Sequence, residues 1–557
     1  MIAKPPAANT LYYGDNLAVM RAHIPDGSVD LVYLDPPFNS NASYNVLFKA
    51  PEGHQSQAQI EAFDDTWHWN DSAELACDEI NKSKKHSDVS TMLRAMRNFL
   101  GDNDMMAYLA MMAVRLIELH RVLKPTGSIY LHCDPTASHY LKILLDAVFG
   151  KGAFLNEIIW KRTYAHGSSQ RFGPVHDVIF YYAKNGGHVW TNVRINHDPD
   201  YIEKHFRQTD AVRNEQFQAI SLTGAGIRKG DSGKPWRNVD PSLVNRHWAL
   251  PGAIVEKEGI EGGTVQQRLD ALDKAGRIFW PETGSTPRLK WFVSDLGGAA
   301  IADTWTDIAP IGAQAKERLG YPTQKPVALL ERILAASSNE GDVVLDPFCG
   351  CGTTLHAAAK MNRNWIGIDV THLAIGLIRR RLTDAFPQIA FNVAGVPKDI
   401  GGARALASQD KYEFQKWALS MIHSQPYKGG KKGGDGGVDG FLYFKLESKK
   451  TEVAIVSVKG GGNLNPGMIK DLIVTVDQQG AKMGVFLTLE PPTKGMVAQA
   501  AAAGLFKTDF GNFPKIQIVT VAQLFLPGNP LQIPWQDTSV FKKTKREDTK
   551  AQSKLDL

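Results

Sequence analysis

A strand, a glycine-rich turn, a helix and a second strand follow one another between Val343 and Asp369, and this order constrains the fold most. The first strand ends at Asp346, and the segment Asp-Pro-Phe-Cys-Gly-Cys-Gly-Thr-Thr leads into an alanine-rich helix at 354–360. The next strand, 365–368, ends in an acid close to the roughly 20-residue offset at which a carboxylate meets ribose hydroxyl groups. The order predicts a doubly wound, Rossmann-like α/β sheet that binds a nucleotide cofactor. The turn lacks the G-x-G-x-x-G spacing, which disfavours a nicotinamide cofactor.

Another strand end carries a different group of side chains. Residues 29–34 form an apolar run that stops at Asp35, Pro36, Pro37 and Phe38. The prolines fix φ and remove two backbone donors, so the turn is stiff and its carbonyl groups remain free as acceptors. Asp35 and such a carbonyl can accept the two hydrogens of an exocyclic amine while Phe38 stacks on the ring, at about 1–3 kcal/mol. Holding both N–H groups out of the ring plane frees the lone pair for attack on an electrophile. An ordinary strand-to-loop turn is the alternative.

These motifs give the chain a specific resemblance. Asp35-Pro36-Pro37-Phe38 is similar to the catalytic motif of the DNA amino-methyltransferases, and residues 346–354 resemble their S-adenosylmethionine motif. Residues 321–326, Tyr-Pro-Thr-Gln-Lys-Pro, resemble the segment that closes over the methionine end of that cofactor. A catalytic motif that precedes the cofactor motif is the circularly permuted order of the β class. The resemblance covers about residues 10 to 390.

The resemblance implies roles for individual residues. Asp35 and the neighbouring backbone hold the amine of a base flipped out of the duplex, and Phe38 stacks on that base. The residues expected to contact S-adenosylmethionine are Asp15, Lys325, Asp346, Phe348, Gly350, Gly352, Thr353 and Asp369. A helix N-cap is the alternative role for Asp15. No metal is expected in the methyltransferase, because the sulfonium is already an activated electrophile.

The resemblance predicts a site-specific methyltransferase of double-stranded DNA that acts in restriction-modification or phage defence. Adenine N6 is favoured over cytosine N4, because the motif begins with Asp, the commoner family choice for adenine. A DNA-binding or nuclease effector whose methyltransferase half acts only as a sensor is the contrasting alternative. A homodimer and further restriction or defence subunits are the protein partners considered.

Further elements extend the sheet through a catalytic half at residues 1–185. Helices are expected at 105–123 and 136–149, and strands at 128–131, 157–160 and 178–182. His132, at a strand end, is either beside the target base or structural. Residues 39–68 are expected to form a loop that orders on substrate, and residues 70–90 show no clear period.

Residues 186–315 interrupt this alternation and are assigned to an inserted target-recognition region. They mix aromatic and basic side chains: Trp190, Arg194, Trp236, Arg237, Arg246, Trp248, Arg277, Trp280, Arg288, Lys290 and Trp291. Such side chains fit phosphate contacts, guanine-edge pairing and stacking on a distorted duplex. A loop-rich insert whose tryptophans form their own core is the alternative. The cofactor half is expected at 316–393, followed by a linker at 394–410.

A C-terminal α/β module is expected at 411–530. An acid before one strand, Asp439, and a lysine at the end of the next, Lys459, can share a metal-bound phosphate, with the lysine orienting an attacking water. The pattern resembles the catalytic domain of Mrr-like restriction endonucleases, of the PD-(D/E)xK superfamily. That family has Glu or Gln two residues before the lysine, where this chain has Ser457, a poor magnesium ligand.

Three residues are candidates to compensate for that serine, namely Glu413, Gln478 and Gln479. Magnesium at Asp439 with DNA cleavage is one expectation for the module, and a DNA-binding relic is the other. The basic tail, 531–557, is expected to be disordered and weakly attracted to phosphate.

Composition bounds these hypotheses. A chain of 557 residues predicts several domains, and a net charge of +5 with 22% charged residues confines any nucleic-acid surface to a local patch. Four cysteines without paired clusters predict neither a disulfide scaffold nor a zinc site. The N-terminus has no apolar signal-like run, and the most apolar helical segment, 108–122, carries three charged residues. A soluble, cytoplasmic protein without membrane contact is expected.

Overall fold

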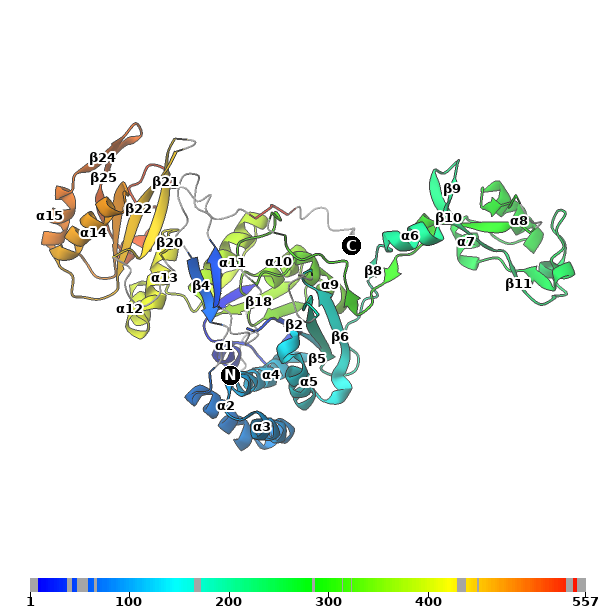
Figure 1. Cartoon of the computed structure of the whole chain (residues 1–557), viewed down its shortest axis with the longest axis horizontal. Coiled ribbons are helices and arrows are strands. Elements are labelled where there is room, and N and C mark those ends of the chain that lie inside the picture. The colour runs from blue at the N-terminus through cyan, green and yellow to red at the C-terminus, as the bar shows by residue number, and fades with distance from the viewer. Residues whose placement is uncertain are drawn as a thin grey trace. The chain divides into compact units, whose positions relative to one another are not determined.

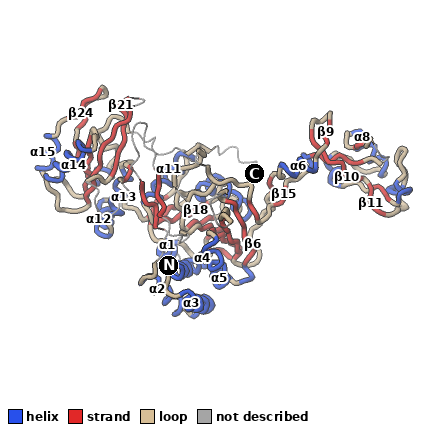
Figure 2. Tube along the Cα trace, in the orientation of Figure 1, coloured by secondary structure: helices blue, strands red, loops and turns tan. Residues whose placement is uncertain are grey.

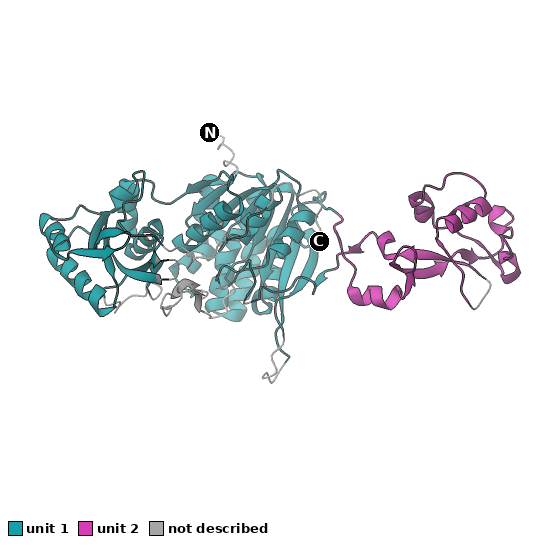
Figure 3. Ribbon diagram, turned by 90° about the horizontal axis from the view of Figure 1, so that it is seen from above, with its two compact units in different colours: residues 1–191, 303–554 teal, residues 192–302, 555–557 magenta. Residues whose placement is uncertain are grey.

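The computed structural model describes residues 9–37, 43–47, 59–64, 68–164, 172–282, 286–312, 314–321, 323–427, 437–447, 450–536 and 544–547. The chain divides into two compact units, one of residues 192–302 and one of residues 1–191 with 303–554 (Figures 1 and 3). The smaller unit lies within the segment assigned to target recognition.

A nine-stranded sheet organises the larger unit. Its strands, in spatial order, are β16 (Thr304–Trp305), β6 (Phe154–Lys161), β7 (His176–Ala183), β5 (Leu123–Cys133), β2 (Val29–Leu34), β17 (Val343–Asp346), β18 (Asn364–Asp369), β1 (Thr10–Tyr13) and β19 (Asn392–Ala394). Strand β7 runs antiparallel to both neighbours, and the other neighbouring pairs are parallel. The Rossmann-like prediction is confirmed.

Helices cover both faces of this sheet. Ile366 and Ile368 of β18 belong to a hydrophobic cluster with α1 (Asn16–His23), α4 (Asp104–Val122) and α5 (Pro135–Phe149). Gly367, between them, faces Leu355 of α10 (Thr353–Lys360), because successive strand residues point to opposite faces. Helix α9 (Val327–Ser337) packs on α10, and α11 (His372–Ala385) packs on β1 and β18. No described helix is long and apolar enough to cross a lipid bilayer.

Two N-terminal segments differ from expectation. The expected loop at 39–68 contains an antiparallel hairpin, β3 (Ser43–Leu47) with β4 (Gln59–Asp64). Residues 70–90, without a clear period in the sequence, form α2 (Asp71–Lys82) and the start of α3 (Ser87–Leu100). Asn70 caps α2 through the backbone N–H groups of Ser72 and Ala73. The helix was missed because its buried face consists largely of alanine and cysteine.

The C-terminal domain is a five-stranded sheet between two hydrophobic clusters. Its strands are β20 (Gln425–Pro426), β21 (Gly440–Glu447), β22 (Lys450–Lys459), β23 (Met483–Thr488) and β26 (Ile516–Thr520). One cluster includes α12 (Ile400–Gln409) and α13 (Lys411–Met421), and the other includes α14 (Pro466–Gln478) and α15 (Lys494–Ala502). The α/β prediction for this module is confirmed.

The expected linker and tail are partly ordered. Helix α12 occupies most of the expected linker, because Asp399 caps it and Ala403 and Ala407 are buried in the core of the domain. Leu531 is also buried in that core. Further along the expected tail, Glu547 donates its backbone N–H to Ala385 O. The prediction of disorder is therefore wrong for 531–536 and 544–547, and the other tail residues lie outside the described residues.

The smaller unit contains a four-stranded antiparallel sheet, which Figure 2 shows in red beside blue helices. Its strands are β13 (Ile278–Phe279), β14 (Arg288–Phe292), β10 (Glu215–Ser221) and β9 (Gln208–Asp210). Trp236 and Trp248 lie in its hydrophobic core with residues of α7 (Gly252–Lys257) and α8 (Val265–Lys274). The alternative, that tryptophans form a core of the insert, holds for these two residues.

Candidate active site

The strand ends that carry the predicted acids lie side by side. Strand β17 is the parallel neighbour of both β2 and β18. Asp35 follows β2, and Asp346 and Asp369 are the last residues of β17 and β18. The next strand, β1, pairs Tyr13 with Asp369 and leads to Asp15. Because parallel strands end at one edge of the sheet, four acids from distant parts of the sequence meet where such sheets bind ligands.

The glycine turn after β17 is held beneath Asp369. Gly350 and Gly352 have φ of 49° and 74°, in the left-handed region that favours glycine. The N–H of Gly350 donates to Asp369 Oδ2 at 2.9 Å. A Cβ atom on Gly352 would lie 2.8 Å from Ile378, and one on Gly350 would lie 3.3 Å from the ring of Tyr321. The turn therefore requires glycine at both positions, as the cofactor motif predicts.

Burial raises the pKa of both acids beside this turn. The pKa of Asp346 is raised to about 7, although Phe348 N donates to its carboxylate at 3.1 Å. The pKa of Asp369 is raised to about 6, although Thr371 donates both its N–H and its hydroxyl to the carboxylate. A cation bound here would favour the ionised acids. The site is thus electrostatically suited to a positively charged cofactor.

Asp35 is held by a lysine through one oxygen only. Lys325 Nζ lies 2.6 Å from Asp35 Oδ2, and both side chains are largely buried. Asp35 Oδ1 is buried and has no hydrogen-bond partner within the described ranges. An unpaired buried acceptor costs about 1–3 kcal/mol, so this oxygen is prepared to accept a donor from a ligand. Lys325, expected at the cofactor, contacts Asp35 in the structure.

A buried hydrogen-bond chain lies behind Asp35. Tyr33 OH contacts His132 Nδ1 at 2.8 Å, and His132 Nε2 contacts Asp177 Oδ2 at 3.0 Å. Burial alone would raise the pKa of Asp177, but the hydrogen bond from His132 and the charges of Lys325 and Arg162 bring it below its usual value. His132 is fully buried. The structural alternative for this histidine therefore holds.

Asp15 connects the first strand to the cofactor turn. It caps α1, with Oδ1 accepting from Ala18 N at 3.0 Å, and pairs with Arg115 at 2.6 Å. Arg115 also donates to Asn16, whose amide donates to Pro347 O at 2.8 Å. The N-cap alternative is confirmed, and an adenine contact by Asp15 stays a prediction. Nothing in the sequence indicates that Asn16 joins the two segments.

The other predicted site residues have different environments. Pro36 is buried and Pro37 half-buried, whereas Phe38 lies outside the described residues. The hydroxyl of Thr353 accepts from Arg381 at 3.0 Å, which fixes the start of α10. Sequence reasoning also missed Val370. This apolar residue directly follows Asp369 and is 59% exposed.

In the C-terminal domain, Asp439 is enclosed by hydrogen-bond donors. Oδ2 accepts from Val458 N at 2.6 Å and from Ser457 Oγ at 3.4 Å, and Oδ1 accepts from Gln415 Nε2 at 2.6 Å. Gln415, on α13, was missed in the sequence. Lys459 ends β22 on the neighbouring strand. The structure thus brings Asp439, Ser457 and Lys459 together.

The candidates to compensate for Ser457 do not contact Asp439. Glu413 instead binds Lys416 at 2.9 Å, and its second oxygen accepts from Tyr13 OH at 3.4 Å. Gln478 and Gln479 are exposed at the end of α14. One carboxylate with amide and hydroxyl neighbours is a poor donor set for magnesium, which prefers several oxygens at near-octahedral geometry.

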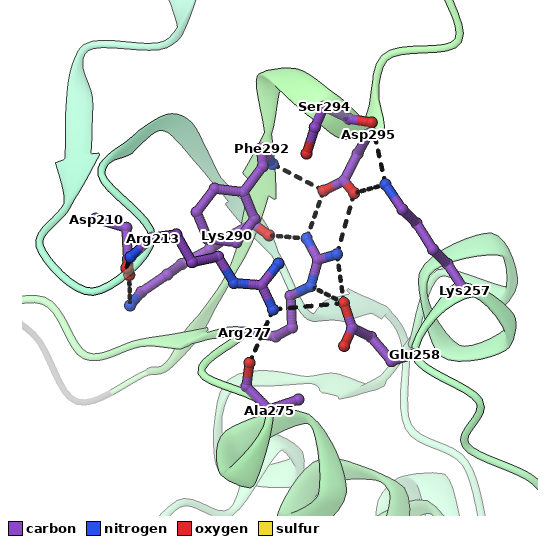
Figure 4. Close-up of polar contacts among 10 residues, drawn as sticks. All are labelled: Asp210, Arg213, Lys257, Glu258, Ala275, Arg277, Lys290, Phe292, Ser294 and Asp295. Atoms are coloured by element: carbon purple, nitrogen blue, oxygen red, sulfur yellow. Dashed lines mark hydrogen bonds and ion pairs between the residues drawn. The ribbon is translucent and has the colours of Figure 1, made fainter.

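A buried ion-pair network fixes the smaller unit (Figure 4). Arg277 is 1% exposed and contacts both Glu258 and Asp295 at 2.5 Å. Lys290 binds Asp210 at 2.6 Å. Arg277 and Lys290 are therefore structural rather than free for phosphate. Of the aromatic and basic residues singled out in the sequence, the exposed ones are Trp190, Arg194, Arg237, Trp280 and Arg288.

The parallel strand ends, the glycine turn and the proline-flanked acid define a class, the S-adenosylmethionine-dependent methyltransferases that act on an amine. Within that class, the chain belongs to the DNA methylase family, whose model matches residues 29–379. Residues 406–516 match a second family, described as restriction endonuclease. The predicted fusion of a DNA amino-methyltransferase with a restriction-endonuclease domain is confirmed.

Individual relatives agree with the family. The chain is 29% identical to the type II methyltransferase M.EcaI of Enterobacter cloacae over 375 residues, 67% of this chain and 69% of that protein. It is 49% identical to the DNA adenine methyltransferase YhdJ of Escherichia coli over 78 residues, 14% of this chain and 26% of that protein. A DNA modification methylase of Thermus thermophilus, solved with S-adenosyl-L-methionine, is 16% identical and aligns over 69% of this chain and 97% of its own, with a TM-score of 0.32.

Proposed function

We propose that this enzyme methylates adenine N6 at a defined site in double-stranded DNA, as part of restriction-modification or phage defence. The observation that carries the proposal is Asp35 Oδ1, which has no partner among the described residues and lies at the sheet edge shared with Asp346 and Asp369. The aspartate that opens the motif and the similarity to an adenine methyltransferase support adenine. Cytosine N4 presents the same amine chemistry and is the alternative.

Each protein group has a distinct task in the proposed reaction. Asp35 Oδ1 accepts one N–H of the flipped base, a carbonyl of the Asp35-Pro36 region accepts the other, and Phe38 stacks on the ring. Lys325 occupies Oδ2, so the carboxylate has one orientation toward the amine. When bound, S-adenosylmethionine supplies a methyl group on a cationic sulfur that needs no metal activation. Asp35 Oδ1 is also placed to accept the proton that the methylated amine loses.

The proposed cofactor contacts follow the sheet edge. Asp369 accepts from the ribose hydroxyl groups, and the turn from Phe348 to Thr353 lies along the methionine portion. Asp15 and Val370 flank the adenine ring. Asp346 braces the turn, because its carboxylate accepts from Phe348 N. Lys325, in the position in which it binds Asp35, also lies toward the methionine end of the cofactor.

We further propose that residues 192–302 read the target sequence. Exposed Trp280 and Arg288 suit stacking and phosphate contacts, and Arg237 is exposed but paired with Asp273. The buried Arg277 network keeps the surface that carries them folded. A homodimer or further restriction subunits would complete such a system. The proposed DNA substrate supports a cytoplasmic location.

Magnesium-dependent cleavage at Asp439 is not part of the proposed function. The described surroundings of that carboxylate supply no second acid, and no group of three metal-ligating His, Cys, Asp or Glu side chains occurs among the described residues.

The test is transfer of tritium from labelled S-adenosylmethionine to DNA, followed by nucleoside analysis. Labelled N6-methyladenine is the expected product. Labelled N4-methylcytosine would show that the target is cytosine, the alternative base. Binding of cofactor and DNA without any labelled base would support the sensor alternative and overturn the proposal.

A further inference from the structure

The centre of the C-terminal domain is a closed hydrogen-bonded corner. Asp439 is 7% exposed, and its two oxygens accept from a backbone N–H, a hydroxyl and a side-chain amide on three different residues. The two shortest of these bonds, from Val458 N and Gln415 Nε2, are both 2.6 Å. Such donors neutralise a buried carboxylate without a cation.

The residues around Asp439 do not fit the metal that nuclease chemistry in this family of folds requires. Hard divalent cations need several oxygen ligands, and proteins usually provide more than one carboxylate. Here the neighbouring positions are Gln415 and Ser457, which are neutral, and Glu413 is bound to Lys416 instead. Among the described residues, Asp439 is the one carboxylate in this corner, and a single carboxylate would hold magnesium weakly.

The basic member of the motif is nevertheless present and accessible. Lys459 ends β22 at the carboxyl edge of the parallel strands β22, β23 and β26, where it pairs with Thr488. It is partly exposed, and its ammonium has no ion-pair partner in the described part of the chain. A cation in this position attracts a phosphate whether or not a metal is bound.

The charge of the domain favours the same ligand. Residues 411–530 contain fourteen lysines, nine acidic residues and no arginine, a net charge of +5 that equals the net charge of the whole chain. The remaining residues together carry no net charge. The domain is therefore the basic part of the protein, as expected for a module that binds nucleic acid by its phosphates.

We propose that the C-terminal domain binds DNA phosphates without a metal and does not cut the strand. Lys459 contacts the backbone, and the Asp439 corner holds β21, β22 and α13 together instead of carrying a metal. The domain thereby adds sequence-independent affinity to an enzyme whose proposed substrate is DNA. The inference rests on the proposed function only in its choice of DNA as the ligand. Binding and cleavage are both measured without the methyl donor, so their outcome is separate from that of the methylation test.

The first experiment measures binding of the full-length protein to a duplex of unrelated sequence in EDTA, over a range of salt concentrations. K459Q is expected to weaken binding and to reduce the slope of log affinity against log salt by about 1. The matched control is K482Q, which removes the same charge from an exposed lysine just before β23, at the opposite edge of the sheet. Unchanged binding by K459Q, or equal losses in both variants, would overturn the assignment of Lys459.

The second experiment adds magnesium or manganese to supercoiled plasmid. The wild type is expected to leave the plasmid intact, with no manganese bound tightly enough to detect by electron paramagnetic resonance. The double variant Q415E/S457E supplies two further carboxylates and is expected to bind manganese. Metal-dependent cutting by the wild type that D439A or K459A abolishes, with methylation retained, would overturn the proposal and leave the methyltransferase function standing.

Discussion

Lys325 Nζ lies 2.6 Å from Asp35 Oδ2, whereas Asp35 Oδ1 has no hydrogen-bond partner among the described residues. The lysine comes from the segment just before α9 and the aspartate from the end of β2, nearly three hundred residues earlier in the chain. The pair thus joins two distant segments at the side chain that is expected to hold the target amine through its other oxygen. Its geometry makes Lys325 a positioning residue for Asp35.

Replacement of Lys325 tests this positioning role. K325M is expected to lower kcat about 10- to 100-fold with little change in the KM for DNA, because a misplaced acceptor affects the reacting geometry more than binding. K325R is expected to restore part of the rate. The control is K142M, which removes the lysine of the Lys142–Asp146 pair on α5. A large change in KM with unchanged kcat would assign Lys325 to binding alone.

The pH dependence of cofactor affinity tests the two buried acids. Asp346 and Asp369 have raised pKa values, about 7 and about 6, so both take up protons in the free enzyme as the pH falls from 8 to 6. A cationic ligand favours the ionised acids, so affinity for S-adenosylmethionine is expected to fall about tenfold over this range. Calorimetry at both pH values measures the change. S-adenosylhomocysteine, which lacks the sulfonium charge, is the matched ligand, and an equally steep profile for it would contradict the electrostatic account.

The raised pKa of Asp346 predicts that a neutral side chain at this position makes the folded protein more stable at high pH. Because the folded pKa of Asp346 lies above its unfolded value, the acid binds more protons folded than unfolded, and its contribution to stability falls as the pH rises from about 4 to about 7. D346N is expected to melt at a higher temperature than the wild type at pH 8 and to bind S-adenosylmethionine poorly. An equal or lower melting temperature at pH 8 would indicate that the carboxylate stabilises the turn more than its burial costs.

Two glycines on neighbouring segments allow a matched test of the cofactor turn. Gly352 has a left-handed φ of 74°, and its added Cβ would meet Ile378 at 2.8 Å. G352A is expected to abolish cofactor binding and to cost about 1–3 kcal/mol of stability. Gly376, within α11, has open space for a Cβ, so G376A is expected to retain binding and to be neutral or stabilising. Cofactor binding by G352A with wild-type affinity would mean that the turn is not the cofactor site.

Because the Arg277 network is buried, its loss is expected to destabilise the smaller unit rather than to remove a direct contact with DNA. R277L removes the buried guanidinium that contacts Asp295 and Glu258, which then keep only Lys257 and Arg213 among their described cationic partners, and is expected to destabilise this unit by about 3 kcal/mol. R288Q removes an exposed arginine from the adjacent strand and is expected to weaken DNA binding without lowering stability. Limited proteolysis of residues 192–302 distinguishes the two variants. Wild-type resistance of R277L would contradict the structural role of the network.

The cofactor half could be predicted well because its chemistry dictates local sequence. The left-handed φ at Gly350 and Gly352 and the buried strand before Asp346 each require particular residue types at fixed spacing. The hydrophobic periodicity of helix α2 is weaker, because its buried face consists largely of alanine and cysteine, whose small side chains do not distinguish a helix from a loop. Burial of small residues becomes informative only when the neighbouring helices are known.

The individual side-chain contacts between distant segments could not be predicted. Nothing in the sequence distinguishes Lys325 bound to Asp35 from Lys325 bound to the cofactor, or Gln415 beside Asp439 from Glu413 in that place. The buried ion pairs of Arg277 look the same in the sequence as exposed phosphate contacts. In each case the sequence allows more than one arrangement of the side chains, and only the folded chain decides between them.

The most direct test of the account is the single-turnover rate of methyl transfer by D35N beside its affinity for the cofactor and for DNA. Asparagine keeps the shape of the side chain but can turn an N–H toward the amine and removes the charge that Lys325 binds. D35N is expected to bind both ligands with affinities near those of the wild type and to transfer methyl at least 100-fold more slowly, about the loss of one preorganised group. Transfer at the wild-type rate would show that Asp35 does not hold the target amine.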